Sequence, residues 1–325
     1  MKYSVIVPVY NRPDEVDELL ESLTHQTFKD FEVVIVEDGS QVGCKDVCDK
    51  YNDCLDIHYY YKDNSGPGQS RNYGVERARG EYVIIVDSDA VAPTDYLQAI
   101  DDELRRQPSD AWGGPDAAHE SFTDVQKAIS YAMTSFFTTG GIRGGKKQLD
   151  KFYPRSFNLG VRREAYLKLG GFSKTRFSKM SLYGEDIDFS IRIYKAGLSC
   201  RLFPEAWLWH KRRTDFRRFW RQVYNSGYAR INLWRMYPEA LKPVHALPSL
   251  FTAGCAALLL LAPFTRCLSL LPLLLYVLLI LIDSTVRNRS LKVGLISVPA
   301  VFVQLVGYGV GFIESWWVNS VMKRR

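Results

Sequence analysis

Hydrophobic and polar positions follow two alternating patterns along the first hundred residues. Short apolar runs rich in β-branched side chains predict strands at 4–9, 31–36, 58–61 and 82–86. The segments between them predict helices at 14–26 and 69–79, the first because its apolar side chains recur three or four positions apart. Strands that alternate with helices predict an α/β fold with a mostly parallel sheet. Ligands of such sheets bind beyond the carboxyl ends of the strands.

The middle of the chain is less regular. It predicts strands at 158–161, 198–203 and 206–209 and helices at 163–169 and 184–196. Three acidic residues, Glu185, Asp186 and Asp188, lie in the first turn of the last helix, and His210 directly follows the last strand. Side chains that could act in catalysis or bind a metal therefore also occur in this part of the chain.

Three long apolar stretches follow, at 246–264, 267–282 and 293–317. A helix needs about 20 residues to cross a membrane, so the first stretch is long enough and the second is slightly short. Only Thr265-Arg266 separates these two, which predicts a hairpin. The third stretch carries Pro299, Gln304 and Glu314, so a spanning, a re-entrant and an interfacial helix all stay open.

The distribution of charge bears on the arrangement in a membrane. Three full spans would place Lys323-Arg324-Arg325 outside, against the tendency of positive charge to stay inside. A buried helical subdomain is the alternative to a membrane region, but the first two apolar stretches contain no charged residue. We therefore expect an α/β domain at 1–230, a linker at 231–245 and a membrane region at 246–325. That region consists of a helical hairpin at 246–282 and a third apolar segment at 293–317.

Charge and cysteine content limit the kinds of partner that the chain can bind and the cellular compartment in which it can lie. The 325 residues carry a formal net charge of +6, and residues 211–221 hold six basic side chains against Asp215 alone. Because this basic stretch ends shortly before the apolar region, an anionic membrane surface or a diphosphate is a better partner than nucleic acid. The six cysteines fit no zinc-binding spacing, and we expect them to be reduced, as in a cytosolic domain.

Asp87-Ser88-Asp89 directly follows the strand at 82–86. Two carboxylates in this position can hold a hard divalent cation such as Mn²⁺ or Mg²⁺ together with phosphate oxygens. A solvated turn is the alternative. The buried strand before the motif and the turn after it favour the metal site.

Other polar residues follow the neighbouring strands. Asp38 can accept a hydrogen bond from a nucleobase, although Asp38 or Ser40 as a helix N-cap explains the sequence equally well. Pro8 and Tyr10 can pack against the same base. Arg71 can reach a phosphate, and its alternative is a surface ion pair.

These motifs together resemble a known family. The segments Ser4–Asn11, Val36–Ser40, Gly68–Gly74 and Asp87–Asp89, in this order, resemble family 2 glycosyltransferases of the GT-A fold over about the first 230 residues. The resemblance implies that Asp38 reads uracil or a similar base and that Asp87 and Asp89 form the metal motif. It also implies that Gly68, Arg71, Asp87 and Ser88 lie on the nucleotide side, with Pro8 and Tyr10.

The resemblance further implies an inverting transfer by direct displacement. In that family a later Glu-Asp pair supplies the catalytic base, and Glu185-Asp186 matches it. We expect Asp186 to be the base, while Glu185 and Asp188 are close enough in sequence to be confused with it. His210 could complete the metal site as a neutral imidazole ligand, as in several GT-A relatives, and a structural or phosphate-binding histidine is its alternative.

Together these observations lead us to expect a metal-dependent glycosyltransferase that uses a nucleotide-sugar donor. A UDP-sugar is the donor we expect. The apolar region favours an acceptor confined to the membrane, such as a lipid-linked saccharide in cell-surface polysaccharide or glycolipid synthesis. It also favours a place at the inner (cell) membrane with a cytoplasmic catalytic domain. Alternatives are direct transfer to polyprenyl phosphate, a nucleotidyltransferase, and a membrane scaffold without catalysis. The segment 218–222 matches the Gln-x-x-Arg-Trp element of processive synthases poorly, which speaks against processive polymerisation.

Overall fold

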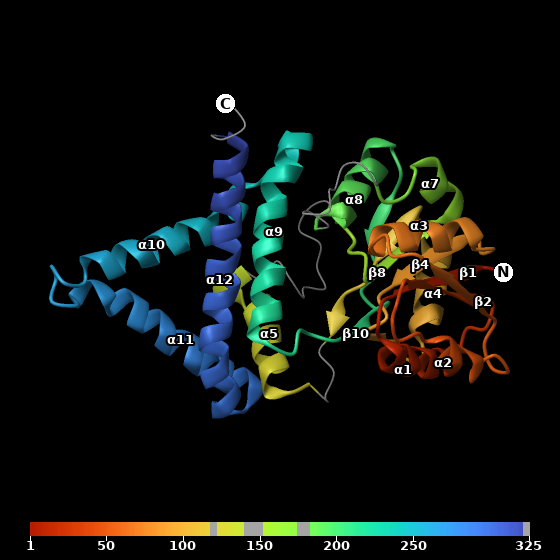
Figure 1. The fold of residues 1–325 in the computed structure, drawn as a ribbon, viewed down its shortest axis with the longest axis horizontal. Coiled ribbons are helices and arrows are strands. Elements are labelled where there is room, and N and C mark those ends of the chain that lie inside the picture. Colours follow the sequence, from red (N-terminus) through yellow and green to blue (C-terminus); the bar gives the residue numbers. More distant parts are fainter. Residues whose placement is uncertain (118–121, 140–151, 174–182, 321–325) are drawn as a thin grey trace. The chain divides into compact units, whose positions relative to one another are not determined.

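The structure is a computed structural model that describes residues 1–117, 122–139, 152–173 and 183–320. The chain divides into two compact units, Met1–His119 with Gly145–His210, and Glu120–Gly144 with Lys211–Arg325. Figure 1 shows the elements of both units along the chain. The expected charged end at 323–325 lies outside the described residues.

Among its described residues, the first unit contains a seven-stranded sheet in the order β3-β2-β1-β4-β8-β6-β9. Its strands are β1 (Tyr3–Val9), β2 (Phe31–Asp38), β3 (Ile57–Lys62), β4 (Tyr82–Val86), β6 (Ala111–Gly113), β8 (Asn158–Arg162) and β9 (Cys200–Leu202). Neighbouring strands are parallel except that β8 runs antiparallel to both β4 and β6. The predicted mostly parallel α/β sheet is therefore confirmed.

A small three-stranded sheet joins segments far apart in the sequence. It has the order β5-β10-β7, formed by β5 (Ala90–Val91), β10 (Leu208–His210) and β7 (Asp116–Ala117). β5 directly follows the Asp87-Ser88-Asp89 motif, and β10 ends at His210. The pairing of these two short strands decides where His210 lies.

Helices cover the large sheet on both faces. They are α1 (Pro13–Thr24), α2 (Lys45–Asp49), α3 (Pro67–Arg77), α4 (Tyr96–Arg106), α7 (Arg163–Lys168) and α8 (Glu185–Lys195). Side chains of β1 alternate between two apolar cores: Tyr3, Val5 and Val7 pack with α1, α2 and α4, and Ile6 packs with α3, α7 and α8. This period of two is the geometry of a strand with both faces buried.

The second unit is helical in its described residues. Its helices are α5 (Asp124–Thr134), α6 (Phe136–Thr139), α9 (Phe216–Met236), α10 (Leu247–Leu261), α11 (Leu271–Asn288) and α12 (Leu291–Ser320), with short 3₁₀ turns at Pro238–Ala240, Pro243–Ala246 and Leu268–Leu270. α12 runs alongside α9 (Figure 1) and also contacts α5, α10 and α11. Phe219 and Val223 of α9 share an apolar core with α12, which is why α9 belongs to this unit. The division at His210 thus differs from the boundary expected at 230 and the linker expected at 231–245.

Among the described residues, three helical segments are long and apolar enough to cross a membrane: Pro243–Leu261, Leu268–Asn288 and Leu291–Asn319. They correspond to the three apolar stretches of the sequence. α10 buries none of its apolar side chains, and Leu260 is 73% exposed, whereas half of α12 is buried against its neighbours. Such exposed leucines are suited to a membrane rather than to water.

Candidate active site

Three strand ends bring the predicted polar residues to one edge of the sheet. Val9 of β1 lies opposite Glu37 of β2, and Ile6 lies opposite Ile85 of β4. Asp38 therefore ends β2 at nearly the level where Asp87 leaves β4, with β1 between them. Because strands lie about 4.8 Å apart, the two backbone positions are separated by about 10 Å of sheet.

His210 joins the Asp87-Ser88-Asp89 motif from the far end of the first unit. Its backbone pairs with Ala90, because β10 lies antiparallel to β5. His210 Nε2 consequently lies 3.1 Å from Asp89 Oδ1 and 3.9 Å from Asp87 Oδ2. The ring of Phe157 stacks on the imidazole, with 4.7 Å between ring centroids and planes 6° apart, and so fixes its orientation.

This group has the chemistry of a site for a divalent cation. Asp87, Asp89 and His210 each offer one ligand atom, all within 4.8 Å of one another. Asp89 Oδ1 is buried and receives no hydrogen bond from a donor, although His210 Nε2 is near. Two ligand atoms about 2.1 Å from one ion at right angles are about 3 Å apart, so this spacing suits Mn²⁺ or Mg²⁺.

Asp89 is poised to remain ionised. Burial by itself raises the pKa of Asp89, but His210 and Arg12 outweigh burial and hold that pKa well below its usual range. Metal binding requires a deprotonated carboxylate. The side chain is therefore ready to act as a ligand near neutral pH.

Arg71 connects the motif to the last helix of the unit. Its Nη2 lies 2.9 Å from Asp87 Oδ1 and its Nη1 lies 2.6 Å from Glu185 Oε1, and the guanidinium is almost completely buried. The alternative of a surface ion pair is therefore wrong. Burial raises the pKa of Glu185 to about 7, against the opposing effect of Arg71. Glu185 is thus tied to the interior rather than presented to a ligand.

The three acids of α8 have different surroundings. Asp188 is fully buried and pairs with Arg192, whose guanidinium also donates to the carbonyl oxygens of Leu169 and Gly171. Asp186 is only partly buried, and its Oδ1 accepts a hydrogen bond from the backbone N–H of Ile187. Of the three, Asp186 has the surroundings that a base acting on a bound hydroxyl needs.

The predicted base-binding residues lie at the ends of β1 and β2. Asp38 is buried, accepts hydrogen bonds from the backbone N–H groups of Ser65 and Gly66 at 2.9 Å, and pairs with Lys62. It therefore ties the loop before α3 to the sheet and does not cap the helix that follows it. Tyr10 is half exposed and Pro8 is partly buried.

Gly68 and Ser88 are both buried at the same edge of the sheet. A Cβ on Gly68 would overlap Glu185 Oε2, so glycine is required where α3 and α8 meet. Ser88 lies between the two aspartates of the motif. Both positions are thus determined by close packing around Asp87 and Glu185.

Sequence reasoning missed Arg12, whose Nη1 lies 2.8 Å from Asp89 Oδ2 and 2.9 Å from Glu15 Oε2. It also missed Phe157, which supports His210. Arg12 lies in the loop after β1, so its position beyond a strand end was a signal that could have found it. Phe157 precedes β8 and has no local signal.

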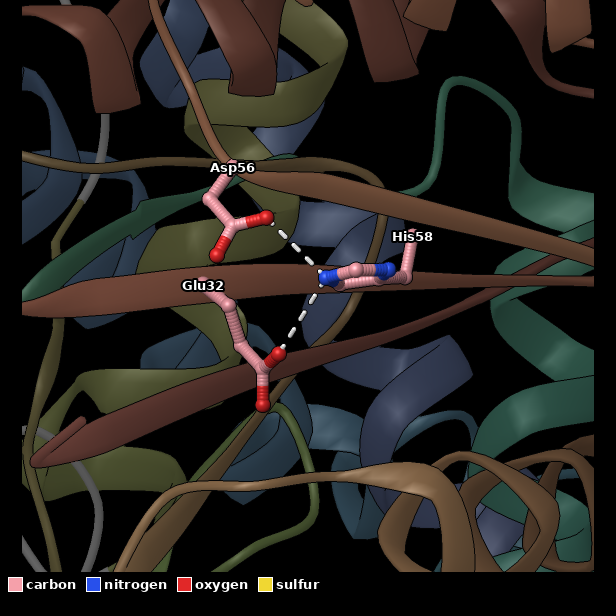
Figure 2. A group of neighbouring side chains, drawn as sticks. All are labelled: Glu32, Asp56 and His58. Atoms are coloured by element: carbon pink, nitrogen blue, oxygen red, sulfur yellow. Dashed lines mark ion pairs between the residues drawn. The ribbon is translucent and has the colours of Figure 1, made fainter.

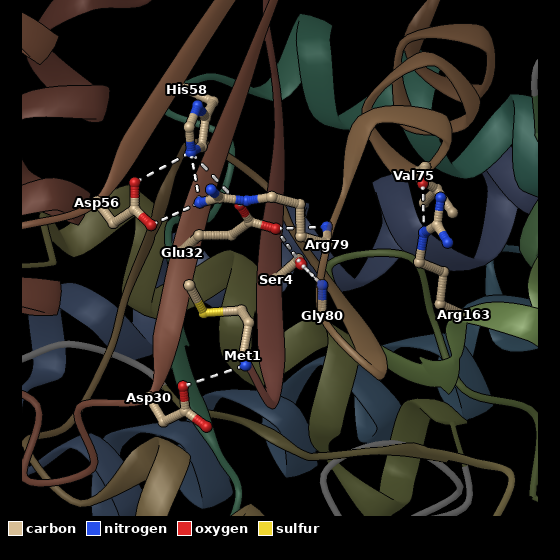
Figure 3. Close-up of polar contacts among 10 residues, drawn as sticks. All are labelled: Met1, Ser4, Asp30, Glu32, Asp56, His58, Val75, Arg79, Gly80 and Arg163. Atoms are coloured by element: carbon tan, nitrogen blue, oxygen red, sulfur yellow. Dashed lines mark hydrogen bonds and ion pairs between the residues drawn. The ribbon is translucent and has the colours of Figure 1, made fainter.

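A second acidic group lies at the opposite edge of the sheet. His58 Nε2 is 3.0 Å from Asp56 Oδ1 and 3.4 Å from Glu32 Oε2, as Figure 2 shows. Arg79 already occupies this group, because its Nη2 lies 2.6 Å from Asp56 Oδ2 and 2.7 Å from His58 Nε2 and its Nε lies 2.7 Å from Glu32 Oε2 (Figure 3). A guanidinium only donates, so His58 Nε2 is the acceptor and its lone pair is engaged. Of the two groups, the one formed by Asp87, Asp89 and His210 is therefore the better candidate for a metal site.

Comparisons with known proteins identify the family and the fold of the chain. The profile of "Glycosyl transferase family 2" matches residues 4–170. An uncharacterized glycosyltransferase of Rickettsia felis is 31% identical over 137 residues, which cover 42% of this chain and 22% of that protein. The chain thus spans less than a quarter of the Rickettsia relatives it matches.

Two further proteins are similar over most of the chain. A glucosyl-dolichyl phosphate glucuronosyltransferase of Haloferax volcanii is 27% identical over 257 residues, covering 74% of this chain and 80% of that protein. The mannosyltransferase PcManGT of Pyrobaculum calidifontis, solved with GDP-Man and Mn²⁺, matches with a TM-score of 0.62 at 18% identity, covering 99% of this chain and 88% of that one. The second similarity is one of fold.

Proposed function

Because this chain belongs to glycosyl transferase family 2, we propose that it transfers a sugar from a UDP-sugar to a lipid-linked saccharide at a membrane, with Mn²⁺ or Mg²⁺ in its active site. The observation that carries the proposal is the group formed by Asp87, Asp89 and His210 at the carboxyl edge of the sheet. Nucleotide-binding α/β proteins use this edge. Intact acidic residues there also speak against a scaffold without catalysis.

The metal would be held by Asp87, Asp89 and His210. When bound, it would supply positive charge for the diphosphate that leaves the sugar. Arg71 keeps Asp87 in place through its buried ion pair, and Phe157 keeps the imidazole of His210 in one orientation. These side chains hold the ligand set rigid before the substrate arrives, which avoids reorganisation during the reaction.

Asp186 would act as the base for an inverting displacement. It would accept the proton of the acceptor hydroxyl while the hydroxyl oxygen attacks the anomeric carbon and the bond to the nucleoside diphosphate breaks. Glu185 would serve as the anchor of α8 through Arg71, and Asp188 would anchor the turn at Leu169 and Gly171 through Arg192. Only one of the three neighbouring acids would thus contact substrate.

Asp38, with Pro8 and Tyr10, would bind the nucleobase. Tyr10 is half exposed, so its ring is available for stacking. Asp38 Oδ1 accepts hydrogen bonds from Ser65 and Lys62, whereas Oδ2 accepts only from Gly66 among the described residues and would have a further lone pair for a base imide. GDP-Man in PcManGT makes a guanine nucleotide the main competitor.

A membrane-confined acceptor is supported by two observations. Three apolar helical segments of the described chain are long enough to cross a bilayer. The Haloferax relative is named for a glucosyl-dolichyl phosphate substrate. An inner-membrane location with a cytoplasmic catalytic unit would bring nucleotide-sugar and lipid acceptor together. Direct transfer to polyprenyl phosphate is the second candidate, since such a lipid would also be confined to the membrane.

The test is a thermal-shift screen of the full chain in detergent with UDP-, GDP- and dTDP-sugars and Mn²⁺. UDP-sugars should stabilise most, and Asp89→Asn should abolish the metal-dependent shift. Asp95→Asn, which removes an exposed carboxylate outside the group, is the matched control. A shift that survives Asp89→Asn would remove the proposed metal site. Transfer assays with polyprenyl phosphate and with a polyprenyl diphosphate saccharide would then separate the two acceptors.

A further inference from the structure

Each aspartate of the motif has an arginine of its own. Arg71 pairs with Asp87 at 2.9 Å, and Arg12 pairs with Asp89 at 2.8 Å. A buried carboxylate without a counter-charge is strongly destabilising. Arg12 therefore neutralises a largely buried charge on Asp89, whose side chain is 10% exposed, whereas the Asp87 side chain beside Arg71 is 30% exposed.

The two arginine side chains differ in how deeply they are buried and in how many buried partners hold them. The Arg71 side chain is 6% exposed, is anchored a second time by buried Glu185, and lies over the ring of Phe172. The Arg12 side chain is 37% exposed, and its second partner, Glu15, is itself 29% exposed. Solvent weakens the pair of Arg12 with Glu15, and it also reaches the Arg12 end of the pair with Asp89. Arg12 is thus the arginine that can leave its aspartate.

The backbone at Arg12 is fixed although its side chain is not. Asn11 has a left-handed backbone with φ of 54°, which is uncommon outside glycine. Its N–H donates to Ser40 Oγ, and its side-chain oxygen accepts from the N–H groups of Gln41 and Val42. The loop after β1 is therefore tied to the loop after β2, and this turn directs the Arg12 side chain toward Asp89.

We propose that Arg12 is an exchangeable counter-ion of Asp89 that competes with the divalent cation for this carboxylate. Arg12 neutralises Asp89 through Oδ2 until a cation arrives at Oδ1, and its positive charge opposes the binding of that cation to the same carboxylate. Arg71 stays on Asp87 throughout, because Glu185 holds it. This inference rests on the proposed metal site.

The experiment measures the Mn²⁺ dissociation constant of the full chain in detergent by calorimetry, without nucleotide. Arg12→Gln should bind Mn²⁺ about threefold to tenfold more tightly, because a competing exposed ion pair is gone. Arg12→Lys keeps the charge and should stay within twofold of the unsubstituted chain. Arg106→Gln removes an exposed arginine that pairs with Glu103 and is the control for net charge.

Unchanged or weaker Mn²⁺ binding by Arg12→Gln would overturn the inference. A second readout guards against misfolding: Arg12→Gln should have a lower Tm than the unsubstituted chain without metal and should gain more Tm on Mn²⁺ addition. An equal gain in both would also overturn it. Failure of the proposed function looks different, because the unsubstituted chain would then bind no Mn²⁺, or would bind it equally well after Asp89→Asn.

Discussion

His210 Nε2 lies 3.1 Å from Asp89 Oδ1, although β10 and the aspartate motif lie far apart in the sequence. The contact exists because β10 pairs with β5 directly after the motif and because Phe157 stacks on the imidazole. The strand pairing sets the position of the His210 backbone, and the stacked ring sets the orientation of its imidazole.

His210→Ala should weaken Mn²⁺ binding by at least about 10- to 100-fold, because losing a proposed ligand should cost no less than losing the support of a ligand. Calorimetry on the full chain measures this directly. His25→Ala is the control, because His25 is exposed directly after α1 and its Nε2 lies 3.1 Å from exposed Glu21. Equal Mn²⁺ affinity of His210→Ala and His25→Ala would show that the imidazole is structural.

Gly68→Ala should disturb the active site through Glu185. The added Cβ overlaps Glu185 Oε2, whose carboxylate cannot move freely because Arg71 holds it. We expect a loss of about 1–3 kcal/mol in the free energy of unfolding, typical of overpacking. The double variant Gly68→Ala/Glu185→Asp should recover part of this loss, since the shorter acid leaves room. No recovery in urea unfolding would mean that the overlap does not cause the effect.

The sequence predicted the elements more reliably than the partners of individual side chains. The strand at Tyr82–Val86 and the helix that begins at Glu185 appear as expected, because apolar period and first-turn acids are local signals. The ion pair of Arg12 with Asp89 was not expected, because it joins two loops distant in sequence. Asp188 resembles Asp186 in sequence, and only its burial against Arg192 separates them.

The compact units also departed from the expected domains for a physical reason. A change in composition near residue 246 suggested the boundary, yet α9 packs its apolar face on α12 despite its many arginines. Long-range packing of an amphipathic helix leaves no mark in composition. The three long apolar helices could be predicted, because the composition of each leucine-rich stretch is a local signal that does not depend on packing.

Stability should depend on pH through Glu185. Its pKa is raised to about 7 in the folded chain from 4.5, so the folded state binds the proton more tightly than the unfolded state. The contribution of this group to stability is therefore fully present below about pH 4.5 and is lost as pH rises to 7, by at most about 3 kcal/mol. Urea unfolding at pH 5 and pH 8 measures the effect.

Glu185→Gln removes this titration, so the variant should gain stability relative to the unsubstituted chain between pH 5 and pH 8. Glu76→Gln, which changes an exposed acid on α3, is the control and should show no such relative gain. Parallel pH profiles for the unsubstituted chain and Glu185→Gln would contradict the raised pKa.

The helical unit should be sensitive to small additions between α9 and α12. A Cβ on Gly311 would overlap the backbone carbonyl of Tyr224, whereas a Cβ on Gly254 of α10 meets no atom. Gly311→Ala should therefore cost about 1–3 kcal/mol and lower Tm in detergent. Gly254→Ala should be neutral or slightly stabilising, since alanine favours helix. A Tm unaffected by Gly311→Ala would contradict the close approach of the two helices.

Asp186→Asn should abolish transfer while the chain still binds its donor. Of the three acids in the first turn of α8, Glu185 pairs with Arg71 and Asp188 with Arg192, whereas Asp186 has no guanidinium partner within the described residues. Loss of a positioned base costs about 10²- to 10⁴-fold in rate. Asparagine keeps the shape and still accepts the N–H of Ile187, so Tm and donor affinity should not change.

Asp188→Asn is the matched comparison and should behave in the opposite way. It leaves Arg192 without its buried carboxylate, so Tm should fall clearly, because breaking a buried ion pair on one side costs about 3–5 kcal/mol. Whatever Asp188→Asn protein remains folded should keep most of its turnover per folded molecule. If instead Asp186→Asn keeps full turnover and folded Asp188→Asn loses it, the base is Asp188. In that case Asp186 would not take part in proton transfer, although its side chain is partly exposed.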